Sequence, residues 1–547
     1  MSKVTIGVDF GTLSARAVVV KTENGDVLAE ASEVYSKGVM EETLNGYIPL
    51  PSGFALSDIH DYEKVLISTI RRALELSKVE ASDVIGIGID VTSSTFLPVD
   101  EQIQPLQDLP EFAEEPHAYM KLWKHHGAIE QAKRITALMN ERNESFRDRA
   151  GRAVNAEWML PKLLEICEDA PEVYNRAYGF IEAGDYLNYY LTGELTRSKA
   201  AWGYKMIRSD EDEDRRDFYK ALNKDFENVE EKCPGKKIDL GECAGHLTEE
   251  AAERTGLIPG IPVACFNIDA HVSAAAAGIT KTGKMLAIIG TTCCAVVSSE
   301  KECFVPGISG CVKGGILPGL YGYEAGQSAV GDMFSWFEKN CVPESYVYEA
   351  RERHLSVQEY LTEKASKKKP GETGLLALDW WNGNRSHLAD ADLSGMILGM
   401  TLTTQPEDIY RALLEAVAYG LREIRDNYVL HGVKIDRIIA CGGIPKKNPL
   451  LMQIYADVCN CDIHITREAQ ASALGSSVFA AVSAGKEKGG YDNVTDAIKA
   501  MGHTQRKAYH PNPENVSVYD KLFTEFKRLH DYFGTGGNDV MRRLKKK

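Results

Sequence analysis

The chain contains 547 residues, of which 44% are hydrophobic and 26% are charged, and its formal net charge is −16. This length is too great for one hydrophobic core, so we expect two or more domains. The acidic balance argues against a nucleic-acid-binding protein, and the longest apolar stretches are too short or too interrupted to span a bilayer, so we expect neither nucleic acid nor a membrane as a partner.

The N-terminal segment is predicted to form three meandering strands, a helix and a fourth strand. The strands are expected at Val4–Phe10, Ala15–Thr22, Val27–Tyr35 and Val84–Val91, and the helix from about Asp58 to Lys78. The helix is indicated by apolar side chains at helical spacing. This order of elements favours a mixed sheet with helices on its faces, and therefore an α/β fold.

The middle of the chain combines helical and irregular sequence. Residues 116–195 read as mainly helical, with a kink or a helix start near Pro161 and a helix C-cap at Gly193. Residues 206–260 are polar and irregular, and the acidic run at 210–214 is expected to be an exposed loop.

A buried strand and a helix of small residues then lead into a second lobe, which starts near Lys284. The expected elements of this lobe are a hairpin at Met285–Ser299, an amphipathic helix at Ile409–Leu430 capped by Gly432, a strand at Arg437–Cys441, a helix from about Asn448 and a helix of small residues at 469–485. Small residues suit the last of these helices to close packing against a neighbour. The polar residues that follow are expected to be peripheral.

A strand, a Gly-Thr turn and a second strand occur twice, about half a chain apart. The copies are "TIGVDFGTLSARAVVV" (Thr5–Val20) and "MLAIIGTTCCAVVSS" (Met285–Ser299). Such turns expose backbone N–H groups and a hydroxyl, which are the donors that phosphate oxygens need. We therefore predict two related lobes, 1–283 and 284–488, that hold a nucleotide between them, followed by a peripheral segment, 489–547.

Two aspartates stand near strand ends. Asp9 precedes the first Gly-Thr turn, and alone it is explained by a hydrogen bond to that turn. Two phosphate-binding turns that face each other require a cation between them, so we predict metal binding at Asp9. Asp269 opens a helix and is read either as a helix cap or as a general base facing the cleft. His271 would complete an Asp-x-His metal pair, but no other His or Cys cluster supports it.

Two glycine-rich segments differ in what they indicate. Gly442-Gly443 stands between a strand and a helix, either as an ordinary tight turn or as a surface that a flat ring approaches closely. Residues 278–285 resemble a P-loop but lack the Ser or Thr that binds magnesium, and they connect a helix to a strand rather than a strand to a helix. We read this second segment as a connecting turn.

Twelve cysteines are scattered without a disulfide framework, and no signal peptide precedes them. Reduced thiols in a cytoplasmic protein are the simplest explanation. The sequence does not fix the oligomeric state, and a homodimer is compatible with it.

Several segments in a fixed order resemble the FGGY family of carbohydrate kinases, within the actin-like, ribonuclease-H-like ATPases. They span roughly residues 4 to 485 and are "GVDFGTLSARAVV", "EWMLPKLLE", "DYLNYYLTGE", "NIDAHVSAAAAG", "IGTT", "CGGIPKKNPLLMQIYADV" and "ASALGSSVFAAV". The resemblance implies two ribonuclease-H-like lobes around a central cleft, with the sugar on the N-terminal lobe and the nucleotide on the C-terminal lobe.

Three segments resemble most closely the family members that phosphorylate L-ribulose: "EWMLPKLLE", "AWGYKM" and "YGYEAGQSAVGDMFSWF". The resemblance implies ATP-dependent formation of L-ribulose 5-phosphate in arabinose catabolism, with ATP, Mg²⁺ and a ketopentose as ligands. Two alternatives remain open. One is a kinase of another pentulose or polyol, such as xylulose, and the other is a non-enzymatic actin-like nucleotide switch.

The resemblance also implies roles for individual residues. Asp269 would accept the proton of the sugar hydroxyl, and a carboxylate near its ordinary pKa would suffice because the hydroxyl becomes acidic late in a loose transition state. The sugar would contact Asp269, Lys205, Glu324 and the segment Thr92–Phe96, in particular Thr95 and Phe96. Magnesium would lie at Asp9, the phosphates at Gly11, Thr12, Gly290 and Thr291, and the adenosine at Gly442, Gly443 and Asn448.

The chain departs from the family at one point. Family members of this type often read Leu-Trp-Lys-Asp-His where this chain has Leu122-Trp123-Lys124-His125-His126. This difference weakens any transfer of a substrate role to His125 and bears on the sugar preference. Packing or a surface position is the simpler reading of both histidines.

Overall fold

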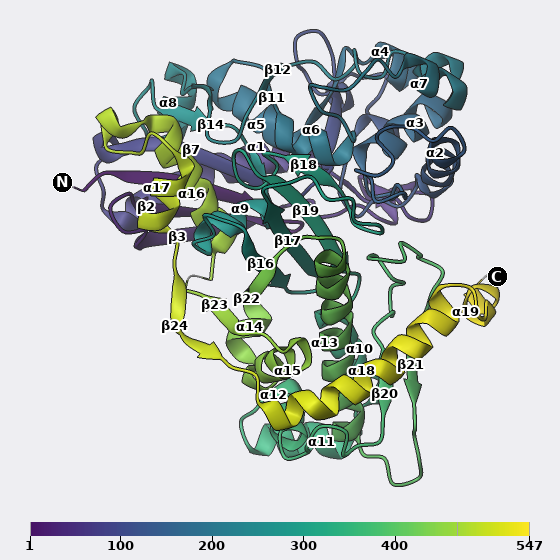
Figure 1. Ribbon diagram of the computed structural model, residues 1–547. Helices are drawn as coiled ribbons and strands as arrows, with labels where there is room; N and C mark the ends of the chain where they lie inside the picture. Colours follow the sequence, from purple (N-terminus) through teal and green to yellow (C-terminus); the bar gives the residue numbers. More distant parts are fainter. Residues whose placement is uncertain (1, 468, 546–547) are drawn as a thin grey trace.

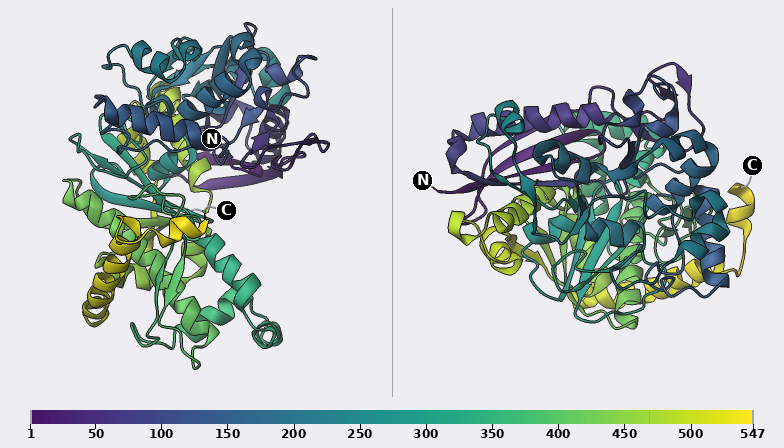
Figure 2. Two further views of the ribbon diagram at one scale, coloured as in Figure 1. Left: turned by 90° about the vertical axis from the view of Figure 1, so that its right-hand side faces the viewer. Right: turned by 90° about the horizontal axis from the view of Figure 1, so that it is seen from above.

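The computed structural model describes residues 2–467 and 469–545, which form two lobes, each built on a seven-stranded sheet (Figure 1). The strand order is β13-β14-β7-β1-β2-β3 in the first sheet, with β15 paired to β7, and β18-β19-β17-β16-β22-β23-β24 in the second. The expected α/β class is therefore confirmed. Figure 2 shows the two lobes stacked along the long dimension of the molecule.

The first sheet has the predicted order of elements. The central strand β1 pairs antiparallel with β2 and parallel with β7, and α1 covers one face. These elements span Val4–Phe10 (β1), Ser14–Lys21 (β2), Val27–Val34 (β3), Ile59–Ser77 (α1) and Val84–Val91 (β7), and the remaining strands are β13 (Cys243–His246), β14 (Pro262–Ala264) and β15 (Asn267–Ile268).

The middle of the chain is helical, as predicted, but also contains short strands. Its helices are α2 (Ile129–Glu141), α3 (Met159–Asp169), α4 (Pro171–Arg176), α5 (Ala183–Thr192), α6 (Lys199–Lys205), α7 (Arg216–Leu222) and α8 (Glu249–Thr255). Pro161 lies in the first turn of α3, so the proline marks a helix start rather than a kink. Gly193 caps α5 with a φ of 71°, as predicted.

The short strands of the first lobe lie outside its main sheet. A four-stranded sheet has the order β10-β8-β9-β6, and two strand pairs accompany it. The strands are β4 (Thr43–Leu44), β5 (Ile48–Pro49), β6 (Leu56–Ser57), β8 (Phe96–Val99), β9 (Met120–Lys121), β10 (Gly179–Glu182), β11 (Thr196–Ser198) and β12 (Lys236–Ile238).

The second sheet repeats the pairing of the first. Its central strand β16 pairs antiparallel with β17 and parallel with β22, as β1 does with β2 and β7. The strands are β16 (Gly283–Ile289), β17 (Cys293–Ser299), β18 (Cys311–Lys313), β19 (Tyr321–Gln327), β22 (Ile435–Cys441), β23 (Ile463–Thr466) and β24 (Thr504–Tyr509), with β20 (Leu376–Leu378) and β21 (Met396–Leu398) forming a separate pair. The two Gly-Thr hairpins therefore occupy equivalent places in the two lobes.

Helices pack around this second sheet. The long amphipathic helix α13 begins at Pro406, three residues earlier than predicted, and ends at Leu430. A short helix that was not predicted, α14, precedes α15. The bounds are α10 (Gly331–Cys341), α11 (Glu344–Glu352), α12 (Val357–Ala365), α13 (Pro406–Leu430), α14 (Gly443–Lys447) and α15 (Pro449–Cys459).

The last part of the chain is not peripheral, contrary to expectation. The strand β24 closes one edge of the second sheet, α17 (Val494–Met501) packs against α16, and α18 (Pro513–Gly534) packs against α15. Tyr519 and Phe526 of α18 are buried in the core of the second lobe. The polar composition of α18 misled the prediction because only a narrow stripe of this helix is apolar. A final helix, α19 (Val540–Lys545), follows.

Two helices of small residues, α9 (Asp269–Ala276) and α16 (Ala471–Ala484), lie between the two sheets and share one hydrophobic core with both (Figure 1). Helix α16 comes from the C-terminal half of the sequence but packs directly on β1 and β7 of the first sheet. The approach is so close that a Cβ on Gly7 would lie 1.8 Å from the carbonyl oxygen of Ala473, and one on Gly88 would lie 2.1 Å from that of Ser476. The predicted close packing of this helix is confirmed.

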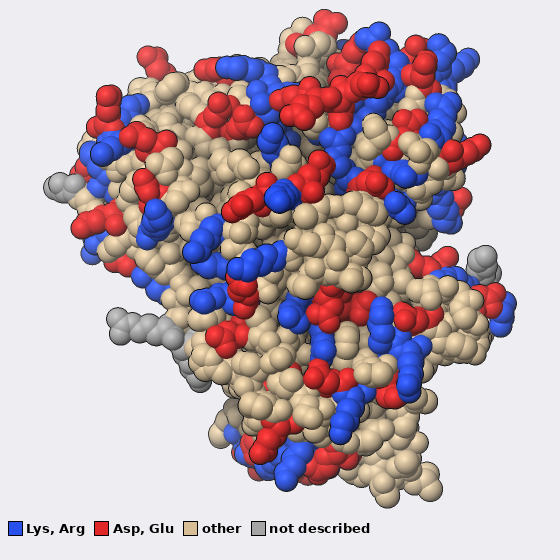
Figure 3. Space-filling model, in the orientation of Figure 1, with Lys and Arg blue, Asp and Glu red and all other residues tan. Residues whose placement is uncertain are grey.

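The surface charge, the thiols and the polarity of the helices can each be compared with the expectations from composition. On the face shown in Figure 3, acidic and basic side chains are interspersed over both lobes. All twelve cysteines are free thiols, and most are buried. Within the described residues, every helix is too short or too polar to cross a membrane.

We predict that Gly88→Ala destabilises the protein by about 2–4 kcal/mol, because the added methyl group would clash with the backbone of α16 rather than with a flexible side chain. The melting temperature by calorimetry measures the effect. Gly443→Ala is the matched control, since its Cβ would meet no atom of the described residues within 4 Å. Equal melting temperatures for the two variants would contradict the tight α16 interface.

Candidate functional site

A cavity of about 280 Å³ lies between the lobes. Elements of both lobes line it, including both Gly-Thr turns, the N-terminus of α9 and the end of α6. The predicted residues that line it are Gly11, Thr12, Lys205, Asp269, Gly290, Thr291 and Glu324. The structure thus brings together residues that are as far as 313 positions apart in the sequence.

The two Gly-Thr turns are stabilised by different hydrogen bonds. In the first, the indole N–H of Trp123 donates a hydrogen bond of 3.0 Å to the hydroxyl of Thr12, and the amide of Gly11 donates to the carbonyl of Ser14. In the second, the amides of Val330 and Gly331 donate to the carbonyls of Thr291 and Gly290. Trp123 also lines the cavity, and the sequence analysis did not assign it a role.

Asp269 is the first residue of α9 and keeps partial exposure to the cavity. Its carboxylate accepts a 2.7 Å hydrogen bond from the amide of Ala270, so it engages the helix N-terminus as well as facing the cavity. Burial and the negative charge of Asp9 raise the pKa of Asp269 to about 7. An ordinary pKa would suffice for a base, and the sequence alone does not reveal the neighbouring charge that raises the pKa here.

Asp9 itself is nearly buried at the end of β1, where its carboxylate forms a 3.0 Å ion pair with Arg16. Directly beside it on β7 is Asp90, and burial together with the charge of Asp9 raises the pKa of Asp90 well above its usual range. One carboxyl oxygen of Asp90 has no hydrogen-bond partner within the described part of the chain. Asp9, Asp90 and Asp269 therefore lie close enough to influence one another at this end of the cavity, although only Asp269 of the three lines it.

At the other end, buried charged side chains form a network. The Nζ of Lys205 lies 3.0 Å from Oε2 of Glu324, and Nε2 of His271 lies 3.1 Å from the same oxygen. Burial alone would raise the pKa of Glu324, but the charge of Lys205 and the hydrogen bond from His271 outweigh it and hold the pKa well below its usual range. Glu324 is therefore an acceptor of hydrogen bonds at neutral pH.

Two further residues extend this network into the cavity. Arg385 lies 3.1 Å from Glu157 and 3.7 Å from Glu324, and its guanidinium is held between these carboxylates. Both residues line the cavity, and the sequence analysis missed both because they stand in irregular segments with no periodic pattern. The sequence around Arg385, "GNRSH", matches no motif that would have indicated a binding residue.

Two of the predicted sugar-contact residues do not line the cavity. Thr95 is buried, and its hydroxyl shares a 2.8 Å hydrogen bond with that of Thr92. Phe96 is also buried and packs edge-on against Phe180. The preceding residues of the same segment, Thr92, Ser93 and Ser94, line the cavity instead. The segment was located correctly, but the strand β8 begins at Phe96 and turns that side chain into the core.

The three residues expected at the adenosine do not line this cavity, although Gly442 lies beside the second turn. Gly442 has a φ of 104°, and a Cβ there would lie 2.4 Å from the carbonyl oxygen of Ile289, the residue before the turn. Gly443 opens α14, and no described atom lies near the position of its Cβ. Asn448 caps α15 by accepting a 2.9 Å hydrogen bond from the amide of Leu451.

His125 and His126 make contacts within the protein and do not line the cavity. His125 is buried outside the cavity, where Nδ1 accepts from the amide of Ala55 and Nε2 lies 2.9 Å from Glu165. Burial and the nearby charge of Lys121 lower the pKa of His125 to about 3, so the ring is neutral and donates through Nε2. His126 contacts Glu157.

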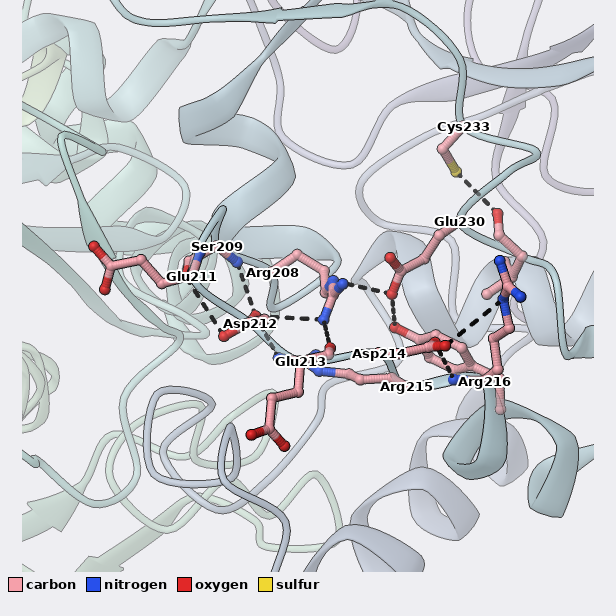
Figure 4. A network of polar contacts seen from close by, with 12 residues as sticks. Arg208, Ser209, Glu211, Asp212, Glu213, Asp214, Arg215, Arg216, Glu230 and Cys233 are labelled. Carbon is pink, nitrogen blue, oxygen red and sulfur yellow. Dashed lines mark hydrogen bonds and ion pairs between the residues drawn. The ribbon is translucent and has the colours of Figure 1, made fainter.

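A second cavity, of about 470 Å³, lies beside α6 and contains neither turn. Several of its charged side chains are paired with one another, as Lys199 is with Asp210 and Asp239. Close to it, Asp212 of the predicted acidic loop accepts hydrogen bonds from the amide of Ser209 and from Arg215, and it forms a 3.7 Å ion pair with Arg208 (Figure 4). The loop is otherwise exposed, as expected. We therefore place the candidate site in the smaller cavity.

Comparison with known proteins identifies the family of this chain. Residues 4–276 match the N-terminal domain and residues 285–484 the C-terminal domain of the FGGY family of carbohydrate kinases. The chain is 47% identical to the ribulokinase of Halalkalibacterium halodurans over 547 residues, which cover 100% of this chain and 97% of that protein. It is 49% identical to the ribulokinase of Bacillus licheniformis, with 98% and 97% covered.

Solved structures share the fold. The xylulose kinase of Rhodospirillum rubrum superposes with a TM-score of 0.78 at 23% identity, covering 96% of this chain and 98% of that one. The glycerol kinase of Plasmodium falciparum, solved with ADP, gives a TM-score of 0.74 at 16% identity, with 95% and 99% covered. The expected two-lobed, actin-like architecture is thereby confirmed.

The raised pKa of Asp269 predicts a pH-dependent stability. Because the folded protein holds this proton more tightly than the unfolded chain does, ionisation of Asp269 destabilises the fold progressively between about pH 4 and pH 7. Asp269→Asn removes that penalty. We expect the variant to melt several degrees higher than the wild type at pH 8 and at nearly the same temperature at pH 4.

The control for this prediction is Asp436→Asn, which removes an exposed carboxylate whose one ion-pair partner among the described residues is Lys434, at 2.9 Å. It should leave the melting temperature nearly unchanged at both pH values. A shift of Asp269→Asn that is the same at pH 4 and pH 8 would show that Asp269 titrates normally.

Proposed function

The chain belongs to the FGGY family of carbohydrate kinases, and from that membership we propose that it transfers the terminal phosphoryl group of ATP to L-ribulose, giving L-ribulose 5-phosphate. The substrate comes from the full-length likeness to ribulokinases. The observation that carries the proposal is the convergence of both Gly-Thr turns, Asp269 and the Lys205–Glu324 pair on one cavity.

The proposed mechanism assigns the turns to the phosphates. Backbone N–H groups and hydroxyls at Gly11-Thr12 and Gly290-Thr291 would hold the phosphate chain from the two lobes. Phosphoryl transfer demands little covalent chemistry of a protein, so alignment of the two substrates is the main task of the site. The adenosine would extend toward Gly442, Gly443 and Asn448, beside the second turn.

Asp269 would accept the proton of the attacking sugar hydroxyl. A base with a pKa of about 7 is matched to neutral pH, because it is ionised in a large fraction of molecules and still binds the proton well. Its place at the N-terminus of α9, fixed by the bond from Ala270, would keep the carboxylate oriented toward the cavity.

The ketopentose would be recognised by the charged network. Glu324 accepts hydrogen bonds, and Lys205 and Arg385 donate them, so together they match the two-way hydrogen bonding of sugar hydroxyls. Thr92, Ser93 and Ser94 would add neutral donors and acceptors. Because these groups are largely buried, a hydroxyl in the wrong orientation would leave one of them unpaired, which disfavours other sugars.

The donor set fits magnesium, which prefers carboxylate oxygens. Asp9 would hold the ion, and the neighbouring Asp90 offers a carboxyl oxygen that has no hydrogen-bond partner among the described residues. When bound, the ion supplies positive charge to the phosphate oxygens. The cytoplasmic location and a homodimer remain predictions of this proposal.

Two alternatives differ in what they require. A kinase of another pentulose or polyol would use the same phosphate turns with a different fit at Lys205 and Glu324. A nucleotide switch would need no polar pocket beside the phosphates, and the buried network of Lys205, Glu324 and Arg385 argues against it.

Sugar specificity tests the proposed substrate. ADP release by the full-length protein, measured in a coupled assay with L-ribulose, D-xylulose and glycerol, should give a kcat/KM for L-ribulose at least about tenfold above the others. A higher value for D-xylulose or glycerol would assign the first alternative. ADP release that no sugar accelerates would favour the switch.

Asp269→Asn tests the proposed base. Removing the proton acceptor should lower turnover on the order of a hundredfold or more, while ATP binding by calorimetry changes little because the turns are intact. The exposed control, Asp436→Asn, should retain full turnover. Turnover near that of the wild type in Asp269→Asn would remove Asp269 from this role.

A further inference from the structure

A cluster of three metal-binding side chains lies in the second lobe, apart from the residues assigned to catalysis. His387 stands in the loop after β20, Glu423 on α13 and His530 on α18. One potential ligand atom from each residue lies within 4.8 Å of the others. The Nδ1 of His387 is 3.5 Å from Oε1 of Glu423. The three residues are separated by more than thirty positions in sequence, so only the fold brings them together.

His530 is buried and has a ring nitrogen that is available to bind a metal ion. This side chain is 1% exposed, and its Nε2 has no hydrogen-bond partner among the described residues. Its other nitrogen, Nδ1, lies 3.0 Å from a carboxylate oxygen of Asp531. A hydrogen bond from Nδ1–H to a carboxylate is the arrangement that fixes the tautomer of a metal-binding histidine and leaves the Nε2 lone pair free.

The geometry of His387 is compatible with the same role. Its ring stacks on that of His530, with the centroids 5.0 Å apart, and its Nδ1 makes no hydrogen bond within the described chain. One buried and one partly exposed imidazole, each with an unpartnered nitrogen among the described residues, therefore flank one carboxylate. Packing alone explains their stacking, but it does not explain why both nitrogens are left unsatisfied beside Glu423.

A positive charge beside the cluster, on Lys527, has a second partner besides Glu423. The Nζ of Lys527 lies 2.5 Å from Oε1 of Glu423 and 3.3 Å from Oδ1 of Asp531, one turn farther along α18. Glu423 has a second carboxylate oxygen, and Lys527 retains Asp531 as a partner. The ion pair therefore leaves Glu423 able to bind a cation.

We propose that His387, Glu423 and His530 form a binding site for a divalent transition metal of the zinc type, with water completing a four-coordinate shell. Two imidazole nitrogens and one carboxylate are a ligand set that favours zinc over magnesium or calcium, which prefer oxygen ligands only. The metal would join α13 and α18 to the loop that carries Arg385, two residues before His387. Its role is therefore to hold this loop in place.

The test uses the full-length protein after treatment with a chelator, titrated with Zn²⁺ in a magnesium-free buffer. Calorimetry and metal analysis should find one tightly bound equivalent, and its binding should raise the melting temperature. His530→Gln and His387→Gln should each weaken that binding by about tenfold or more. The control is His354→Gln, an exposed histidine outside the cluster, which should bind as the wild type does.

Asp531→Asn separates metal binding from packing. This change keeps the shape of the side chain but removes the charge that orients His530, so it should weaken zinc binding by roughly tenfold. No stoichiometric binding to the wild type, or equal binding by all the variants, would overturn the proposal. Equal binding would assign the zinc to other groups, such as the exposed thiol of Cys341. Neither outcome depends on the sugar kinase activity.

Discussion

The packing of α9 and α16 between the two sheets determines where the candidate base lies. Asp269 is the first residue of α9, and α9 touches α16 so closely that a Cβ on Gly475 would lie 2.1 Å from the carbonyl oxygen of Val272. Helix α16 is in turn seated on the glycines of β1 and β7. A chain of backbone contacts, with few side chains between, thus fixes Asp269 relative to the first Gly-Thr turn. Such contacts allow little adjustment, which suits a group that must be aligned with a reacting atom.

The two hairpins share a topology but not a chemistry. Counting back from each turn glycine, Asp9 of the first hairpin corresponds to Ile288 of the second. Their cross-strand partners differ in the same way, since Asp9 faces Arg16 and Ile288 faces Cys294. One lobe therefore carries a partly buried ion pair where the other carries apolar and weakly polar side chains. In the proposed mechanism this difference assigns the cation to the first lobe and leaves the second to hold phosphates through neutral groups.

The sequence predicted those features that rest on local patterns. The strands of the first sheet, the duplicated turns, the C-cap at Gly193 and the close-packing helix at 469–485 each have a signature within a few residues, and the structure contains all of them. The turn residues, Asp269, Lys205 and Glu324 also meet in one cavity. Long-range features were not predictable in this way: Arg385 and Glu157 stand in irregular segments, and α18 hides a narrow buried stripe in a polar helix.

The orientation of side chains marks another limit of the sequence. The segment Thr92–Phe96 was expected at the cavity, and three of its residues, Thr92–Ser94, line it. Which residues face the cavity depends on where β8 begins. The same holds for the pKa of Asp269, which depends on Asp9, a residue 260 positions away in sequence. Electrostatic properties of this kind arise only when the fold sets distances, so residue types alone do not reveal them.

The crowding of acids at one end of the cavity has a consequence for how the proposed reaction is controlled. The charge of Asp9 is one cause of the raised pKa of Asp269, so a cation that offsets this charge would lower that pKa. Asp269 would then be partly protonated in the free protein and ionised once the nucleotide and its metal are in place. In the charged network, Lys205 lowers the pKa of Asp269 and Glu324 raises it, so this ion pair offsets the charge of Asp9 only in part. In the proposed mechanism, the ionisation of the base would thus be linked by charge to occupation of the phosphate site.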